Sequence, residues 1–172
     1  SCDKALAIAP RFCAAHVSRG NALHQLERFE EAIASFERAI RIQPDLAEAY
    51  YNLGNALNDL MRFEESLLNY EKAISLKPDY AEAHLNRANV LQEFYRFDEA
   101  FLGYEKAISL KPDFAEAHLN RANALVEIHQ FDQAFSAYDT AIGTKTDYHD
   151  ALFSRSLLEL LCGRFESGWK NY

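Results

Sequence analysis

Proline recurs at one fixed interval along the chain, and this spacing restricts the possible folds more than any other feature. All four prolines stand 34 residues apart, at Pro10, Pro44, Pro78 and Pro112. Proline ends a helix because it lacks an N–H donor and its ring clashes with the preceding turn. A fixed period of this length predicts a stack of similar units, in which each unit buries its apolar face against its neighbours.

The residues around the prolines repeat as well. Residues 71–80 read EKAISLKPDY and residues 105–114 read EKAISLKPDF, while AEAHLNRAN occurs at both 81–89 and 115–123. We therefore expect a single repeat array with open ends, which is a piece of a longer one. Its predicted parts are four complete units (13–46, 47–80, 81–114 and 115–148), a partial fifth unit (149–172), and a segment (1–12) that matches the second half of an earlier unit.

Each unit is predicted to contain two helices. The first begins after an aspartate, whose side chain is expected to be the N-cap acceptor, and the glutamate three residues later resembles a capping box. The second begins at a phenylalanine and ends before the proline, because the residue before proline is pushed out of the α region. In the fourth unit Thr146 stands where the proline would be, so a looser helix end is expected there. The aspartates are Asp45, Asp79, Asp113 and Asp147.

Residues of one type also return at the same place in every unit. The first helix carries a small residue, which allows the second helix to approach closely, and the second helix carries an aromatic residue. The small residues are Gly20, Gly54, Ala88, Ala122 and Ser156, and the aromatic residues are Phe36, Tyr70, Tyr104, Tyr138 and Tyr172. A leucine column three residues after the small residue is interrupted by Glu159 in the fifth unit.

These columns resemble the tetratricopeptide repeat (TPR) family in all four complete units and most of the fifth. The usual tryptophan near the start of the repeat is absent, and the usual glycine of the central turn occurs only as Gly163. The resemblance implies an all-α, right-handed superhelical solenoid of antiparallel helix pairs. It also implies that the first helices line a concave groove and that the second helices form the convex side.

Asparagine recurs on the first helices in two registers. One column is Asn21, Asn55, Asn89 and Asn123; the other, one turn earlier, is Ser18, Asn52, Asn86 and Asn120. In TPR families these positions face the groove, and the second column resembles the ladder in O-linked N-acetylglucosamine transferases. Asparagine offers a donor and an acceptor, so the columns are predicted to hold the main chain of an extended peptide. The alternative is that they join adjacent helices or contact only water.

The other groove positions are predicted to be apolar near the start of the first helix and acidic near its end. A ligand with apolar and basic residues would complement them, although the carboxylates could equally form a solvated face. Glutamates occupy the places where chaperone-binding TPR domains carry cations, which argues against an acidic C-terminal tail as ligand. The apolar residues are Tyr51, Leu85 and Leu119, and the acidic residues are Asp59, Glu93 and Glu127.

The remaining polar residues are assigned structural roles. A column of arginines (Arg19, Arg87, Arg121 and Arg155) is expected to lay its stems along the helix pair and reach carboxylates. His84 and His118 are expected to pack in the aromatic slot, so no metal site is predicted. Three cysteines without CxxC spacing indicate neither a disulfide framework nor a zinc site, and a reducing, cytoplasmic setting is expected.

Charge and motifs limit the possible functions. A net charge of −8 is unfavourable for binding nucleic acid, and no apolar run is long enough to span a membrane. No phosphate loop or hydrolase motif occurs, so we expect a non-enzymatic scaffold that binds a protein or peptide without a cofactor. The alternative is a substrate-recruiting arm of a larger bacterial enzyme, because residues 163–172 (GRFESGWKNY) resemble the last repeat of TPR proteins that lead into a glycosyltransferase-like domain. The open ends also make end-to-end self-association possible.

Overall fold

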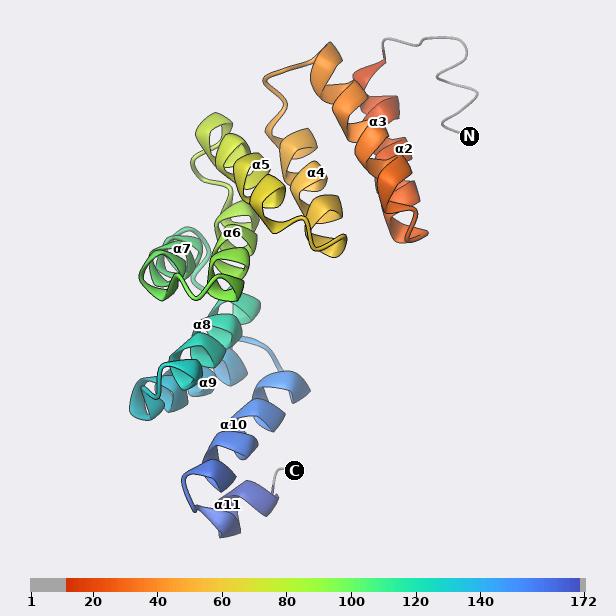
Figure 1. Cartoon of the computed structure of the whole chain (residues 1–172). Coiled ribbons are helices and arrows are strands. Elements are labelled where there is room, and N and C mark those ends of the chain that lie inside the picture. The colour runs from red at the N-terminus through yellow and green to blue at the C-terminus, as the bar shows by residue number, and fades with distance from the viewer. Residues whose placement is uncertain (1–11, 171–172) are drawn as a thin grey trace. The chain divides into compact units, whose positions relative to one another are not determined.

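The computed structural model describes residues 12–170, which form helices joined by short turns and include no strand (Figure 1). This confirms the all-α prediction and the two helices per unit; the half-unit expected over residues 1–12 falls almost entirely outside the described part, as does Tyr172. The first helices are α2 (Cys13–Gln25), α4 (Ala47–Asp59), α6 (Ala81–Glu93), α8 (Ala115–Glu127) and α10 (His149–Leu161). The second helices are α3 (Phe29–Ile42), α5 (Phe63–Leu76), α7 (Phe97–Leu110), α9 (Phe131–Thr144) and α11 (Phe165–Lys170).

The helices group into two compact parts, which we call unit 1 (residues 1–90) and unit 2 (residues 91–172), with the boundary inside α6. These two numbered units are distinct from the 34-residue repeats, which are counted from first to fifth. In unit 1, α2 packs against α3, α3 against α4, and α4 against α5. In unit 2, the same succession runs from α7 through α11. First helices of consecutive repeats also touch within each unit, α2 with α4 and α8 with α10. Packing of this kind is typical of stacked helix pairs.

Small residues on the first helices let aromatic rings of the second helices approach closely. Phe36 and Tyr70 are each 1% exposed and lie against Gly20 and Gly54. A Cβ atom added at Gly54 would lie 2.6 Å from Cε1 of Tyr70, and one added at Gly20 would lie 2.4 Å from Cε1 of Phe36. These distances are too short for a side chain, so glycine is required at both positions unless the rings move.

The starts of the first helices differ from the predicted capping. Leu46, Phe114 and Tyr148 directly precede α4, α8 and α10, and none of the three has a side-chain hydrogen bond to its helix. The aspartates stand one residue earlier, in the turn. There the main-chain oxygens of Asp113 and Asp147 accept hydrogen bonds of 2.9 and 2.8 Å from the second residue along the chain. The predicted aspartate N-caps are wrong because one further residue separates each aspartate from the helix.

The turn between repeats places a lysine over an aromatic ring. Lys77 lies 4.5 Å from the ring centroid of Tyr80, Lys111 lies 4.5 Å from that of Phe114, and Lys145 lies 4.3 Å from that of Tyr148. Cation–π contacts of this geometry are stabilising. The third pair belongs to the turn without proline, yet α9 ends in the same register as α7. The turn itself differs, as expected where Thr146 stands in place of proline: among the described residues Lys145 has no main-chain hydrogen bond like the one that Lys111 donates to Ala107, and Asp147 has a φ of 56°.

The turn inside each repeat holds one residue in the left-handed region of backbone conformation. Its N–H bonds to the carbonyl three residues earlier, and the next N–H reaches the carbonyl five residues earlier, which is a Schellman motif. Gly163 has a φ of 75°, and glycine adopts this region without steric cost. The other four turns place non-glycine residues there: Glu27, Met61 and Tyr95 (φ 57°) and His129 (φ 60°).

Candidate functional site

The two asparagine columns meet on the first helices of unit 1. Nδ2 of Asn52 donates a hydrogen bond of 3.0 Å to Oδ1 of Asn21, and Nδ2 of Asn86 donates one of 2.9 Å to Oδ1 of Asn55. Both bonds run from one repeat to the other column of the preceding repeat. The alternative that asparagines join adjacent helices is thus correct for these four residues, which we call the amide face.

Tyrosine hydroxyls hold part of the amide face in place. The hydroxyl of Tyr70 donates to Oδ1 of Asn55 at 2.8 Å, and the hydroxyl of Tyr51 accepts from Nδ2 of Asn86 at 3.2 Å. Burial raises the pKa of Tyr70 well above its usual range, so this hydroxyl stays protonated and able to donate. Sequence reasoning missed these contacts, although the tyrosines at the aromatic position of the second, third and fourth units were a usable signal.

The hydrogen bonds determine which groups of the amide face stay available. Asn21 and Asn55 accept through their oxygens, and Asn52 and Asn86 donate through their nitrogens. Among the described residues, Nδ2 of Asn21 and Asn55 and Oδ1 of Asn52 and Asn86 make no hydrogen bond. Asn21 is exposed and the other three are half-buried. The amide face therefore presents donors from one column and acceptors from the other.

A pocket of about 220 Å³ opens on this part of unit 1. Three consecutive first helices (α2, α4 and α6) contribute to it. Across its repeat boundary, Nε2 of His24 lies 2.7 Å from Oδ2 of Asp59. The pocket brings together the predicted groove residues Asn55, Asn86, Asn89 and Asp59, and its remaining lining residues are His24, Asn58 and Tyr70.

The predicted apolar positions of the groove are wrong for the two leucines. Leu85 is 1% exposed and Leu119 is 7% exposed, and Leu119 belongs to the core of unit 2. Val17, in the same register, packs with Ala39 and Ala49 from the next two helices. This register therefore points into the contact between repeats. Tyr51 is half-buried, with ring centroids 6.0 Å from Tyr70 and 4.8 Å from Tyr80.

Two of the three predicted carboxylates contact the preceding repeat. Asp59 faces His24, as described, and Glu127 accepts a hydrogen bond from Nε2 of Gln92. These contacts give Asp59 and Glu127 a role in joining repeats, so they are weaker arguments for a basic ligand. Glu93 and Ser18 are exposed, and Asn120 is half-buried on α8.

The arginine and histidine columns have mainly structural contacts. Arg87 binds Glu71 at 3.0 Å, and Arg155 binds both Asp139 and Glu159 at 2.7 Å, which confirms the predicted pairing with carboxylates. Arg19 donates to Ser35 at 2.8 Å, and Nε of Arg121 is buried without a hydrogen-bond partner among the described residues. Nε2 of His84 and of His118 each lies 3.0 Å from a proline carbonyl oxygen. Because a carbonyl only accepts, Nε2 carries the proton.

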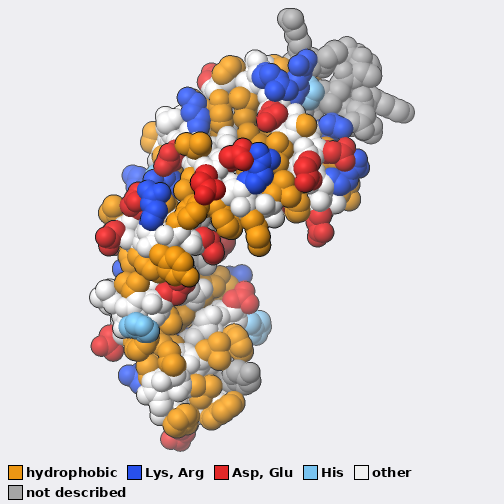
Figure 2. Space-filling view, in the orientation of Figure 1, with side chains coloured by type: hydrophobic (Ala, Val, Ile, Leu, Met, Phe, Trp, Pro, Cys, Tyr) orange, Lys and Arg blue, Asp and Glu red, His pale blue; other side chains and the backbone are white. Residues whose placement is uncertain are grey.

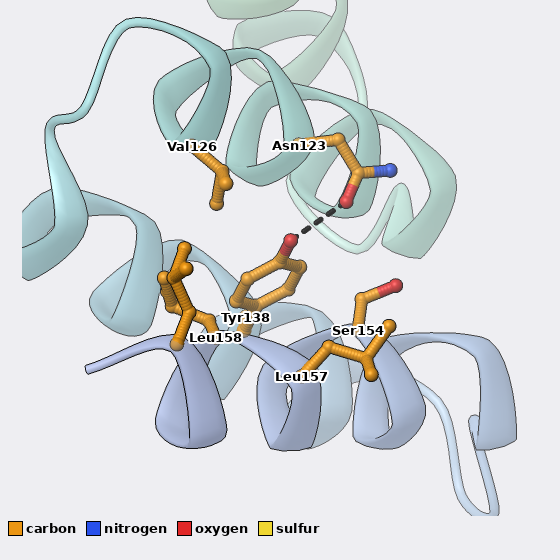
Figure 3. A pocket seen from close by; sticks show the side chains of 7 residues that line it. Asn123, Val126, Tyr138, Ser154, Leu157 and Leu158 are labelled. Atoms are coloured by element: carbon orange, nitrogen blue, oxygen red, sulfur yellow. Dashed lines mark hydrogen bonds between the residues drawn. The ribbon is translucent and has the colours of Figure 1, made fainter. Parts of the chain in front are cut away.

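A second pocket, of about 410 Å³, lies on unit 2 (Figure 3). At its base the hydroxyl of Tyr138 donates to Oδ1 of Asn123 at 2.7 Å, the counterpart of the bond from Tyr70 to Asn55. The rest of the lining is mainly apolar. Sequence reasoning missed this pocket, although the fifth repeat has Leu157 where the other four have asparagine, and Leu161 where the second, third and fourth have an acid. The lining residues are Asn123, Val126, Tyr138, Ser154, Leu157, Leu158 and Leu161.

Surface charge is mixed on the face that Figure 2 presents, where acidic and basic side chains are interspersed. Binding to a nucleic-acid backbone needs a basic patch or stripe, and none is seen on this face. None of the helices in the described part of the chain has the length and hydropathy needed to cross a membrane.

Comparison with known proteins identifies the repeat. A family model described as TPR repeat matches residues 20–60 and 54–93, and one described as tetratricopeptide repeat matches residues 104–135. The chain belongs to the TPR family. A search of curated proteins gave no match.

Solved structures share the TPR fold. PilW, described as a widely conserved type IV pilus biogenesis factor, has a TM-score of 0.90 at 23% identity, over 99% of this chain and 79% of PilW. YrrB, described as a TPR protein with an unusual peptide-binding site, has a TM-score of 0.76 at 19% identity, over 99% of this chain and 88% of YrrB. A thermophilic TPR protein from Thermus thermophilus has a TM-score of 0.78 at 22% identity, over 93% of this chain and 88% of that protein. At these identities the likeness establishes the fold alone.

Proposed function

We propose that this TPR chain is a non-catalytic interaction scaffold, and that its amide face holds an extended segment of a partner protein by the main chain. The observation that carries the proposal is the pattern of available groups: Nδ2 on Asn21 and Asn55, and Oδ1 on Asn52 and Asn86. An extended peptide offers both N–H and C=O groups along its length. The donors and acceptors of the amide face can bind both kinds of main-chain group, whatever side chains the peptide carries.

Preorganisation supports this role. Each asparagine of the amide face already has one end of its carboxamide bonded to a neighbouring repeat. Its orientation is thereby fixed before a ligand arrives, which reduces the entropy lost on binding. Each main-chain bond to a ligand contributes only about 0.5–1.5 kcal/mol net, so several must act together. YrrB, which shares the fold, is described as a TPR protein with a peptide-binding site, and this makes a peptide ligand a reasonable first candidate here.

Replacing asparagine by aspartate tests the proposal without removing the bonds between repeats. Asn21→Asp and Asn55→Asp keep the accepting oxygen and replace only the available donor. We expect the double variant to fold normally and to lose at least about tenfold in affinity, because ligand carbonyls would meet carboxylate oxygens. The probes are decapeptides selected from a random phage-displayed library on the wild-type chain, then synthesised with a fluorophore and titrated by anisotropy.

A charge control separates the lost donor from the added negative charge. Asn69→Asp adds a carboxylate on α5, where Asn69 donates to the main-chain oxygen of Glu65 rather than to the amide face. This variant should bind the peptides as the wild type does. N-methylation of the peptide main chain should also weaken binding to the wild type. Unchanged affinity of the Asn21/Asn55 double variant would show that the amide face is not the binding site. The alternative of a recruiting arm of a larger enzyme stays a prediction based on residues 163–172.

A further inference from the structure

The pockets on unit 1 and unit 2 stand in the same repeat register but differ in chemistry. Asn55, Tyr70 and Asn89 in the first pocket correspond to Asn123, Tyr138 and Leu157 in the second. Asp59, at the acidic position of the first pocket, corresponds by its place in the repeat to Glu127 in the fourth unit and to Leu161 in the fifth. The fifth repeat thus has leucine at both the asparagine position and the acidic position.

One further substitution removes the bond between two amide side chains from the second pocket. Asn86 donates across unit 1 to Oδ1 of Asn55, and Ser154 stands in the corresponding place on α10. The serine side chain is shorter and makes no hydrogen bond to Asn123 among the described residues. The second pocket, at about 410 Å³, is accordingly larger than the first, at about 220 Å³.

The leucines of this pocket are not explained as a surface that a following repeat would cover. In unit 1, residues at this register of α4 line an open pocket although α6 follows and contributes to the same pocket. Leu157 (44% exposed) and Leu161 (67% exposed) hold the same places in their repeat as Asn55 and Asp59 of α4. They would therefore stay accessible even beside a following repeat. Phe153 is different, because its register is the one that buries Leu85 and Leu119, and we leave it out of the pocket.

We propose that the pocket on unit 2 binds one apolar side chain (leucine, isoleucine, methionine or phenylalanine) of an extended peptide segment of a partner protein. This rests on the proposed peptide-binding function and assigns a side-chain preference that the amide face alone lacks. The polar group in the lining argues for a peptide as the occupant. Oδ1 of Asn123 is held by Tyr138, while its Nδ2 makes no hydrogen bond within the described residues. It can donate to a main-chain carbonyl beside the bound side chain, whereas a purely apolar occupant would leave it unpaired.

The decisive variant gives the fifth unit the residues of the fourth. Leu157→Asn and Leu161→Glu introduce the residue types that the fourth repeat carries at the same positions, Asn123 and Glu127. These positions therefore accept both residue types. Ligands are decapeptides selected by phage display on the wild-type chain, each paired with a version in which its apolar anchor residue is replaced by asparagine. We expect the wild type to favour the apolar peptide at least about tenfold, since burying such a side chain is worth that much or more. The double variant should lose this preference.

Controls make each outcome informative. Leu102→Ser removes a leucine that is 68% exposed on α7 and introduces the residue found at Ser136, and it should keep the preference. Circular dichroism and thermal unfolding check that all variants fold. If the wild type binds peptides without an apolar preference, or if the Leu157/Leu161 variant retains it, the pocket proposal fails while the amide-face proposal stands. If no peptide binds the wild type, the proposed function fails and the pocket proposal fails with it.

Discussion

Met61 provides a direct test of the left-handed turn inside the repeats. Its φ is 57°, and its side chain is 77% exposed, so packing contributes little to its energy. A residue with a Cβ atom loses about 1–2 kcal/mol in this conformation, which glycine avoids. Glycine also gives the unfolded chain more conformational freedom, which lowers the free energy of unfolding by about 0.4–1 kcal/mol and offsets part of this gain. Met61→Gly is therefore expected to raise the free energy of unfolding by roughly 0.5–1 kcal/mol.

The measurement is urea unfolding followed by circular dichroism, with Met61→Ala as the matched control. Alanine removes the same exposed side chain but keeps the Cβ atom, so it should change the stability little. Gly163→Ala is the converse variant: Gly163 has a φ of 75° and no atom within 4 Å of an added Cβ, so its cost would come from the backbone alone. Repeat proteins can depart from two-state unfolding, so midpoints are compared only where the slopes agree.

The reasoning is refuted if Met61→Gly is no more stable than Met61→Ala. If neither variant is more stable than the wild type, the turn imposes no steric cost on Met61, or the unfolded-state entropy of glycine cancels it. A stabilisation by Met61→Ala equal to that of Met61→Gly would instead trace the gain to loss of the exposed methionine side chain. Only a gain specific to glycine supports a strained turn.

Two further predictions concern buried polar groups of unit 2. Glu159 is 4% exposed, and its Oε2 is buried without a hydrogen-bond partner among the described residues. Glu159→Leu restores the leucine column and should raise the free energy of unfolding by about 1–2 kcal/mol in urea unfolding. A lower free energy of unfolding would mean that the bond from Glu159 to Arg155 outweighs the desolvation of the carboxylate. Burial raises the pKa of Tyr138 to about 12, so the unfolded state releases this proton first, and the stability it contributes should be complete below about pH 10 and fall as pH rises towards 12. Tyr138→Phe should reduce that fall in thermal unfolding scans, and an unchanged pH profile would contradict the assignment.

The period of the sequence predicted most of the fold because each unit repeats the same local solution. Proline, phenylalanine and small residues at fixed positions located the helix boundaries within a few residues. The end of α9 shows that these positions act together: Lys145 over Tyr148 accompanies the turn where Thr146 replaces proline. One missing signal therefore does not move the helix end.

The candidate site was less predictable, because it depends on which face of a helix meets the next repeat. Leu85 and Leu119 were assigned to the groove by analogy of position, but their register is buried between repeats. The aspartate caps failed by a single residue, a difference that sequence spacing does not resolve. The tyrosine hydroxyls join residues of separate helices, and such contacts appear only when helices are placed side by side.

The asparagines show why two interpretations that compete in the sequence need not compete in the fold. A carboxamide has a donor end and an acceptor end, and each asparagine of the amide face uses one of them to contact the neighbouring repeat. The other end makes no hydrogen bond among the described residues, so stacking of the repeats orients the groups that we propose bind a peptide. Alanine variants remove both ends at once and confuse stability with affinity. Aspartate at Asn21 and Asn55 keeps the stacking bond and alters only the outward end, and for this reason it separates the two roles.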